Sequence, residues 1–422
     1  MVIAAAALLL GGVFRDSTRA AATPPAAEPR TVEELSTADT ATVVQQLQDH
    51  LRAAPSAREY ALLGLAYQQR ARETGDPAYY PKSEGVLRRA LSLTPRDPVA
   101  TSGLGSLVLA RHRFREALRL GREALALQPG NSRDYGIVGD ALVELGRYDQ
   151  AFAAFDAMAR TKPNLAAYAR VSYARELLGD IGGAIQAMGL AADAATGQPE
   201  AAAWTQVQLG KLYWSTGRLN AAARAYRRAL AVFPGYVYAL DPLAQIEAAR
   251  RRLPHAIALE RRAVAAIPLP QFVAFLGDLY RAKGNERLAR RQYALVGVIR
   301  RLLLANGVRT ELETALFQAD HGIRLRATLA LARAAERQRP SIDGDDVLAW
   351  ALERNGRCAE ARGYSKRALR LGTREALKFF HRGMIERCLG NRDGARAWFR
   401  RALELNPHFS LLWAPVAREA LR

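Results

Sequence analysis

The chain has 422 residues, of which 50% are hydrophobic, and a formal net charge of +20 from 61 Lys plus Arg against 41 Asp plus Glu. The apolar content is ample for a packed core, which excludes a wholly disordered chain. The charge is compatible with nucleic acid, acidic polymers or anionic membranes as partners. Only six of the 61 basic residues are lysine. The excess is therefore arginine in an alanine-rich chain, a bias that a high-GC genome also produces.

Residues 1–22 begin with an apolar run, MVIAAAALLLGGVF, that ends at Phe14. The run is shorter than the roughly 20 residues of a spanning helix, but it suits the core of a signal peptide, and Ala20 to Ala22 would suit a signal peptidase. The basic residues that normally precede such a core are missing. We therefore expect an export signal or membrane anchor whose true start lies upstream, with a short frayed helix as the alternative. The expected location is the cell envelope, and a cytoplasmic location is the alternative.

The next two segments lead into the structured part of the chain. Residues 23–30 are rich in Ala and Pro and are expected to be a disordered spacer. Residues 31–56 are expected to hold a single helix that is capped by Asp39 and ended by Pro55. This helix would form a half-repeat that covers the start of the array described next.

The stretch at residues 132–165, SRDYGIVGDALVELGRYDQAFAAFDAMARTKPNL, sets a pattern that the chain repeats. Two segments with helical apolar spacing, Arg133–Leu145 and Tyr148–Thr161, are joined by a turn at Gly146 and closed by Pro163. Such a helical hairpin cannot bury its apolar stripe alone. It has to stack on neighbours, which predicts a solenoid.

A small residue in the first helix marks each repeat. In the stretch above it is Gly139, and because glycine inside a helix costs about 1 kcal/mol relative to alanine, we interpret it as a crossing where another backbone comes too close for a side chain. From Gly105 onward the small residues are 33, 34 or 38 residues apart. The full series is Gly64, Gly105, Gly139, Ser172, Gly210, Ala244, Gly277, Ala315, Ala349 and Gly383.

When the repeats are aligned on these small residues, they resemble the tetratricopeptide repeat, whose 34-residue hairpin carries a Trp, Leu, Gly, Tyr, Ala, Phe, Ala, Pro series. One of the best matches reads Leu209, Gly210, Tyr213, Ala222, Tyr226, Ala229 and Pro234. The resemblance covers residues 57–410 and implies an all-α, right-handed superhelical solenoid of about ten hairpins. Residues 411–422 would form a C-terminal capping helix. After Tyr293 the second helix lacks its terminal proline, so a kink or subdomain break is expected near Asn306 and Gly307.

The family binds proteins or peptides in a concave groove lined by its first helices, so the resemblance implies a non-enzymatic interaction scaffold without a cofactor. Exposed aromatic side chains beside charges would form a hot-spot surface for an extended peptide or a partner helix. The alternative is that Trp204, Trp214 and Trp350 pack between repeats and contact no ligand. The expected groove residues are Tyr173, Trp204, Lys211, Trp214, Tyr238, Asp241, Asp278, Arg281, Trp350, Phe380 and Arg387.

The sequence contains no recognisable catalytic or metal-binding motif. Gly103 and Gly105 lie in a helical pattern, and the pair formed by Gly210 and Lys211 has no Ser or Thr after it, so neither forms a phosphate-binding loop. The six histidines are dispersed without a pair at i, i+4 spacing, so a zinc site is not predicted. We therefore expect no enzyme, no metal and no cofactor.

Cys358 and Cys388 are the only two cysteines. In the repeat frame they fall at the turn of one hairpin and late in the first helix of the next, which are neighbouring places in this kind of stack. A disulfide is therefore expected if the protein is exported to an oxidising compartment. The alternative is two independent small hydrophobic residues.

Pairs of basic residues recur just before the later alanine of the second helix. In a stack of this family they would face outward, so we expect a solvated outer surface. The alternative is a stripe that binds an anionic polymer, either nucleic acid or an acidic polysaccharide. The pairs are Arg88 and Arg89, Arg227 and Arg228, Arg261 and Arg262, Lys366 and Arg367, and Arg400 and Arg401.

Overall fold

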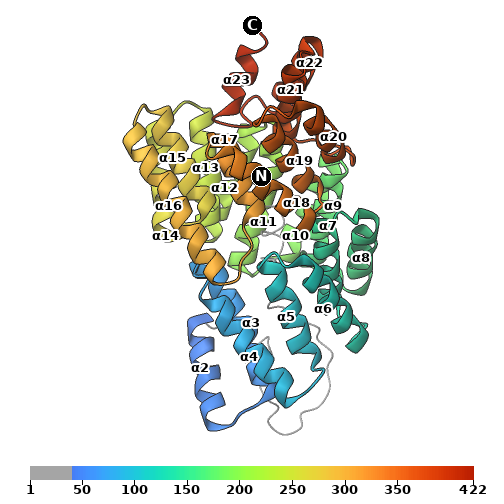
Figure 1. The fold of residues 1–422 in the computed structure, drawn as a ribbon. Helices are drawn as coiled ribbons and strands as arrows, with labels where there is room; N and C mark the ends of the chain where they lie inside the picture. Colours follow the sequence, from blue (N-terminus) through green and yellow to red (C-terminus); the bar gives the residue numbers. More distant parts are fainter. Residues whose placement is uncertain (1–39) are drawn as a thin grey trace.

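The structure, a computed structural model, describes residues 40–422. The expectations for residues 1–30, and for the start of the half-repeat, lie outside the described residues. Within residues 40–422 all regular structure is α-helical and comprises 22 helices (Figure 1). They are α2 (Thr40–Ala53), α3 (Ala57–Thr74), α4 (Tyr79–Leu93), α5 (Pro98–Ala110), α6 (Phe114–Leu127), α7 (Ser132–Glu144), α8 (Tyr148–Thr161), α9 (Leu165–Leu177), α10 (Ile181–Ala194), α11 (Pro199–Ser215), α12 (Leu219–Val232), α13 (Val237–Ala249), α14 (Leu253–Ala266), α15 (Pro270–Ala282), α16 (Glu286–Ala305), α17 (Glu311–His321), α18 (Leu325–Gln338), α19 (Ile342–Glu353), α20 (Cys358–Ala368), α21 (Ala376–Cys388), α22 (Arg392–Leu405) and α23 (Trp413–Glu419).

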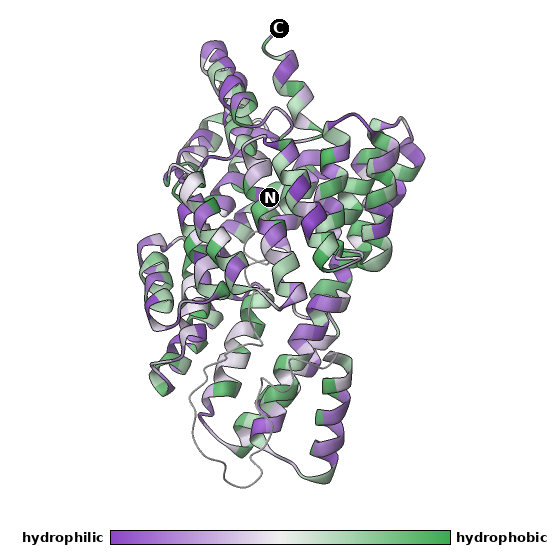
Figure 2. Ribbon diagram, turned by 180° about the vertical axis from the view of Figure 1, so that it is seen from behind, coloured by the Kyte–Doolittle hydropathy of each residue, from purple (hydrophilic) through white to green (hydrophobic). Residues whose placement is uncertain are grey.

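Helices α3 to α22 pair as ten successive hairpins, with α2 before the first and α23 after the last. Many first helices also pack on the first helix of a neighbouring hairpin and so form a layer; this packing runs from α3 to α9, from α11 to α13 and from α17 to α21. We call the surface of this layer the inner face. Hydrophobic and hydrophilic residues share almost every helix, as expected for helices that bury one side each (Figure 2). The all-α superhelix of about ten hairpins is confirmed.

In four of the first helices the small residue, a glycine, makes room for an aromatic ring, whereas Gly64 makes room for Leu87. A Cβ atom added to Gly139 would lie 2.3 Å from a ring atom of Phe155 on the second helix of the same hairpin, and one added to Gly210 would lie 2.2 Å from Tyr226. Our interpretation that a second backbone approaches Gly139 was therefore wrong. The glycine is needed because the large aromatic residue of the second helix packs directly over it.

The stack is interrupted after α16, which at 20 residues is the longest of the described helices. It ends at Ala305, and the loop that follows contains Gly307, which has a φ of 78°. Here α16 and α17 lack the extensive packing that joins every other pair of successive helices. The chain instead meets a distant repeat, because the Arg309 backbone N–H donates to the carbonyl oxygen of Arg111 at 3.1 Å. The break lies near Asn306 and Gly307, as the missing proline predicted.

Contacts between distant repeats recur along the whole second half of the chain. Each joins a residue in or beside the turn inside an early hairpin to the start of a later first helix, to the loop before it, or to the loop before α23. Their partners are 192 to 197 residues apart, which corresponds to roughly six repeats. We call these contacts the seam. They join His112 to Arg309, Glu144 to Arg339, Tyr148 to Ile342, Leu177 to Thr373, and Trp214 to Asn406.

The seam means that the superhelix completes a full turn and packs against itself. In Figure 1, α18 and α19 accordingly lie beside α7, α9 and α10. An open solenoid has contacts only between neighbouring repeats, and its stability is approximately a sum of neighbour terms. Here late repeats also stabilise early ones, so we expect more cooperative unfolding than an open array would show.

Two turn glycines allow the contribution of the seam to the unfolding free energy to be measured apart from that of the turn. Gly146 and Gly356 both turn between the helices of a hairpin, with φ values of 69° and 73°. A Cβ on Gly146 would lie 2.2 Å from the carbonyl oxygen of Pro340 across the seam, whereas one on Gly356 would meet no atom within 4 Å. We expect Gly356→Ala to cost about 1 kcal/mol of unfolding free energy from the left-handed backbone alone.

Gly146→Ala should cost about 1–3 kcal/mol more, because the methyl group forces the seam apart. Urea unfolding of the two variants measures the difference, and small-angle X-ray scattering should show a larger radius of gyration only for Gly146→Ala. Equal losses in the two variants would show that the seam contributes nothing at this turn.

Candidate binding face on the first helices

Four of the predicted groove residues are buried in the core. The exposed fractions are 1% for Trp204, 0% for Trp350 and Phe380, and 8% for Tyr173. The expectation that these side chains are exposed was wrong. For Trp350 the cause is tertiary: its ring stacks on His381 at a centroid distance of 4.5 Å and meets the edge of Trp413 at 5.4 Å. The structure favours the packing alternative for Trp204 and Trp350, whereas Trp214 is half-buried.

Three further predicted residues are half-buried and already have partners. The Tyr238 hydroxyl donates to the carbonyl oxygen of Arg72 at 3.0 Å. The Asp278 carboxylate accepts from the Tyr293 hydroxyl at 2.7 Å, and its Oδ1 lies 2.8 Å from His321 Nε2. The Arg281 guanidinium lies 4.8 Å from the centroid of the Tyr293 ring. Arg387, near the end of α21, is exposed.

The remaining predicted residues, Lys211, Trp214 and Asp241, lie half-buried on α11 and α13. Glu176, on the neighbouring α9, is also half-buried and interacts with Lys211. Sequence reasoning missed Glu176, although it occupies the same position in its repeat as Trp214 does in the next. We call Glu176, Lys211 and Asp241 the inner charge cluster. It comes from three consecutive first helices, which is the arrangement by which a repeat protein presents one continuous surface.

The charges of this cluster are poorly balanced. Burial raises the pKa of Glu176 to about 7, with Glu375 adding to the effect and Lys211 and Lys378 opposing it. Burial also raises the pKa of Asp241 to about 6, against a hydrogen bond from Gln245 and the attraction of Lys211. Burial lowers the pKa of Lys211, while Asp241 and Glu176 oppose that shift. The pKa values of both carboxyl groups therefore stay raised although Lys211 acts on both and Lys378 acts on Glu176, so an additional cation would be favourable.

A third carboxyl group lies behind Asp241. Glu260 on α14 is 0% exposed, and burial together with the neighbouring Asp241 carboxylate raises its pKa to about 11. Glu260 therefore keeps its proton at neutral pH, and the negative charge of the pair belongs to Asp241. The inner face is thus acidic at this point, although the whole chain has a formal net charge of +20.

We expect Glu176→Gln to change how stability depends on pH. The folded-state pKa of Glu176, about 7, lies above the ordinary value of 4.5. Burying this carboxylate therefore costs stability above pH 7, and the cost disappears as the pH falls from 7 to 4.5. Glu176→Gln should raise the unfolding free energy at pH 8 by roughly 1–3 kcal/mol and leave it nearly unchanged at pH 4.5.

Urea unfolding at the two pH values tests this. The matched control is Glu404→Gln, which replaces an exposed carboxylate on α22. An equal gain at both pH values would contradict the assignment of the titrating group.

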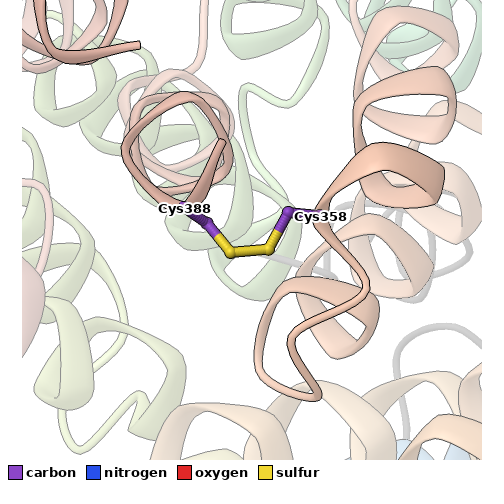
Figure 3. The surroundings of a disulfide bond; sticks show 2 residues. All are labelled: Cys358 and Cys388. Atoms are coloured by element: carbon purple, nitrogen blue, oxygen red, sulfur yellow. A yellow bond between two sulfur atoms is a disulfide. The ribbon is translucent and has the colours of Figure 1, made fainter. Parts of the chain in front are cut away.

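The two cysteines are joined by a disulfide in the structure (Figure 3). Cys358 is the first residue of α20 and Cys388 the last residue of α21, with their Cα atoms 6.0 Å apart. The bond therefore links the last two hairpins of the array.

The basic residues before the later alanines are exposed, as predicted. Some have local carboxylate partners: Arg88 pairs with Glu84, and Arg367 contacts Glu336 and Asp345. Part of the net positive charge of the chain therefore lies on the second helices, away from the inner charge cluster.

Two other kinds of site are absent from residues 40–422. No group of three His, Cys, Asp or Glu side chains gathers there in a way that could hold a metal ion. None of the helices in that part of the chain has the length and apolar character required to span a bilayer.

Comparison with known proteins agrees with the repeat pattern. Two sequence models described as "Tetratricopeptide repeat" match residues 207–269 and 376–409. No curated protein sequence matches the chain. The crystal structure of TTC0263, a thermophilic TPR protein of Thermus thermophilus, is 24% identical, with 46% of this chain and 100% of that chain covered and a TM-score of 0.40.

Human IFIT1, solved as a dimer with m7Gppp-AAAA, is 14% identical over 79% of this chain and 77% of its own, with a TM-score of 0.49. YrrB, "a TPR protein with an unusual peptide-binding site", is 18% identical over 47% of this chain and 97% of its own, with a TM-score of 0.30. At these scores the likenesses say nothing about what this chain binds.

Proposed function

This chain is a tetratricopeptide repeat protein, and from that premise we propose that it is a non-enzymatic scaffold that binds a partner protein or peptide on its inner face. Tetratricopeptide repeats generally mediate protein–protein interactions. The observation that carries the proposal is the inner charge cluster. Glu176, Lys211 and Asp241 come from three consecutive first helices, and burial raises the pKa of both carboxyl groups.

The preferred partner is a segment with basic side chains. A cation placed against Glu176 and Asp241 would stabilise two carboxylates that Lys211 alone does not neutralise. Trp214, half-buried beside the cluster on α11, offers an aromatic surface for the apolar part of the same segment. Binding would lower the pKa values of Glu176 and Asp241 and would therefore be coupled to proton release near neutral pH.

We further propose that the protein acts at the cell envelope. The support is the apolar run of residues 1–22 followed by small residues, together with a disulfide that suits an oxidising compartment. Fractionation of cells that produce the full chain, with a free-thiol assay on the envelope and soluble fractions, tests this location. Recovery of the protein with two free thiols in the cytoplasmic fraction would contradict it.

The second candidate function is binding of an anionic polymer through the exposed arginine pairs of the second helices. The observation in its favour is the exposure of Arg227, Arg228, Arg261 and Arg262 on two successive second helices, α12 and α14. Such binding would be driven by release of counterions and would fall steeply with salt.

One experiment separates the two functions. The full chain is compared with an inner variant, Glu176→Gln with Asp241→Asn, and an outer variant, Arg227→Gln with Arg228→Gln. Partners captured from envelope extracts should bind the unchanged chain and the outer variant at 0.5 M salt and should be lost from the inner variant. Each variant removes two charges from exposed or half-buried positions, so the two variants are matched in the size of the charge change.

The opposite result would contradict the scaffold proposal. Retention of every captured protein by the inner variant would show that the inner face is not the binding site. Loss of heparin or tRNA binding in the outer variant alone, with a steep salt dependence, would establish the second candidate function instead.

A further inference from the structure

The C-terminal segment, residues 406–422, contacts several earlier repeats and does more than cover the end of the array. It starts at the seam, where the Asn406 side chain donates to the carbonyl oxygen of Trp214 at 2.8 Å. Leu411 then packs against the apolar cluster of α13, α14 and α15. Trp413 Nε1 donates to Asp320 Oδ1 on α17 at 2.9 Å, although the two residues are 93 positions apart. The segment therefore joins the fifth hairpin to the eighth and later ones.

Trp413 occupies a site that is built for an indole ring. Its ring stacks on Phe380 with centroids 5.5 Å apart and packs against the edge of Trp350 at 5.4 Å. The Arg354 guanidinium lies 5.8 Å from its centroid. We call Asp320, Trp350, Arg354 and Phe380 the indole subsite. Trp350 and Phe380 stand at repeat positions that line the ligand groove in the resemblance described above, and Trp413 is one of the aromatic residues that cover them.

The chemistry of the subsite selects for an N–H donor on an aromatic ring. Asp320 Oδ1 accepts two hydrogen bonds, one from Trp350 Nε1 at 2.9 Å and one from Trp413 Nε1 at 2.9 Å. Burial raises the pKa of Asp320, while His381 and the two indole donors oppose that shift. A purely apolar occupant would leave a desolvated carboxylate with one donor fewer, which is costly.

A second observation is that a buried polar atom beside the subsite has no hydrogen-bond partner among the described residues. His381 is 0% exposed and stacks on the opposite partner of the subsite, Trp350, with an interplanar angle of 13°. Its Nδ1 lies 2.9 Å from Asp346 Oδ2, but its Nε2 has no hydrogen-bond partner among the described residues. Residues 406–422 therefore do not supply a hydrogen-bond partner for every buried polar atom next to the subsite.

Release of the segment would remove no helix of the ten hairpins, although it would break the seam contact of Asn406 and expose Ala414 and Ala417. Helix α23 is seven residues long, and Trp413 itself is only half-buried. The ten hairpins are each continuous without it. Departure of residues 406–422 would expose Trp350 and Phe380 on the inner face, next to the surface for which the proposed function requires a partner.

We propose that residues 406–422 are an internal ligand, and that the partner of this protein presents a tryptophan side chain that displaces Trp413 from the indole subsite. This deepens the proposed function, on which the identity of the displacing partner rests. The internal segment and the partner compete, so binding on the inner face requires the release of the C-terminal helix. Basic side chains near that tryptophan would reach the inner charge cluster.

The test uses a synthetic peptide of residues 406–422 and the full chain. A fluorescently labelled peptide should bind the Trp413→Ala chain, and binding to the unchanged chain should be at least 10-fold weaker, because the tethered copy competes at a high effective concentration. A peptide carrying Trp413→Ala should not bind. The matched control is the Trp398→Ala chain. It loses a tryptophan of α22 that stacks near Phe379 and Arg401, outside the subsite, and should behave like the unchanged chain.

A folded Trp413→Ala chain that fails to bind the peptide would overturn the proposal. Hydrogen exchange on the unchanged chain gives a second readout that depends on no variant. The amides of residues 414–421 should exchange at least 10-fold faster than those of α21 and α22, and equal protection would overturn the proposal. Neither measurement involves the partner of the inner charge cluster, so failure here is distinguishable from failure of the proposed function.

Discussion

Replacing Arg339 by alanine should destabilise the folded chain by about 3–5 kcal/mol, because it leaves a buried carboxylate without its partner. Arg339 follows α18 and is 5% exposed, and Glu144 at the end of α7 is 2% exposed. The guanidinium forms two hydrogen bonds to Glu144, one of them at 2.9 Å, and a third to Glu313 at 2.9 Å. The ion pair crosses the seam.

The loss should depend on pH. Burial raises the pKa of Glu144 to about 7, with Arg339 opposing the shift. Without Arg339 the folded-state pKa rises further, so the variant is penalised most above pH 7 and regains stability as Glu144 binds a proton at lower pH. Urea unfolding should therefore show a larger loss at pH 8 than at pH 5.5.

Two further variants control this measurement. Arg337→Ala removes an exposed arginine from the last turn of α18, two residues before Arg339, and should change the unfolding free energy by less than about 0.5 kcal/mol. Glu144→Leu combined with Arg339→Met should lose less than Arg339→Ala, since the buried Glu144 carboxylate is removed together with its partner. If Arg339→Ala proves as mild as Arg337→Ala, the two halves of the superhelix are not held together at this ion pair.

Removing the disulfide should cost about 3–4 kcal/mol, the chain-entropy value for a loop of this size. The bond spans 30 residues and ties the start of α20 to the end of α21. The double variant Cys358→Ala with Cys388→Ala avoids leaving a single reactive thiol. We expect its urea midpoint to fall and hydrogen exchange to quicken first in the last two hairpins, α19 to α22.

Reduction of the unchanged chain is the matched experiment. Dithiothreitol should lower the stability of the unchanged chain to that of the double variant and should leave the double variant unaffected. Two thiols that react in the native, unreduced protein would contradict the disulfide. A loss of stability in the double variant that reduction of the unchanged chain does not reproduce would assign the effect to side-chain packing of Cys358, which is 5% exposed.

The local features of the fold could be predicted from the sequence because each is decided within one or two repeats. The hairpin at residues 132–165 illustrates this: α8 has the predicted bounds, Tyr148–Thr161, and α7 begins and ends within one residue of expectation. The pairing of first helices with second helices follows from apolar stripes at helical spacing. The break after α16 followed from a missing proline.

The candidate site was only partly predictable, because the exposure of its residues depends on segments that are many repeats away. Lys211, Trp214 and Asp241 are half-buried, whereas Trp350 and Phe380 are fully buried, although all five were placed by the same repeat positions. Trp350 and Phe380 pack against Trp413, whose Nε1 reaches Asp320 from 93 residues away, as well as against their own repeats. Position within a repeat indicates which side of a helix a residue occupies, but it carries no information on what a distant segment of the chain places there.

The sequence by itself determined that this protein is an array of helical hairpins, how many there are, and where each one turns, because these features depend on periodicity and on contacts between neighbouring repeats. Only the tertiary structure decided that the array closes on itself. The small rotation between successive repeats accumulates over roughly six of them, and only then does Glu144 meet Arg339. The same accumulated rotation brings the C-terminal segment against Trp214 and Asp320, so which side chains remain available for binding depends on the whole turn of the superhelix.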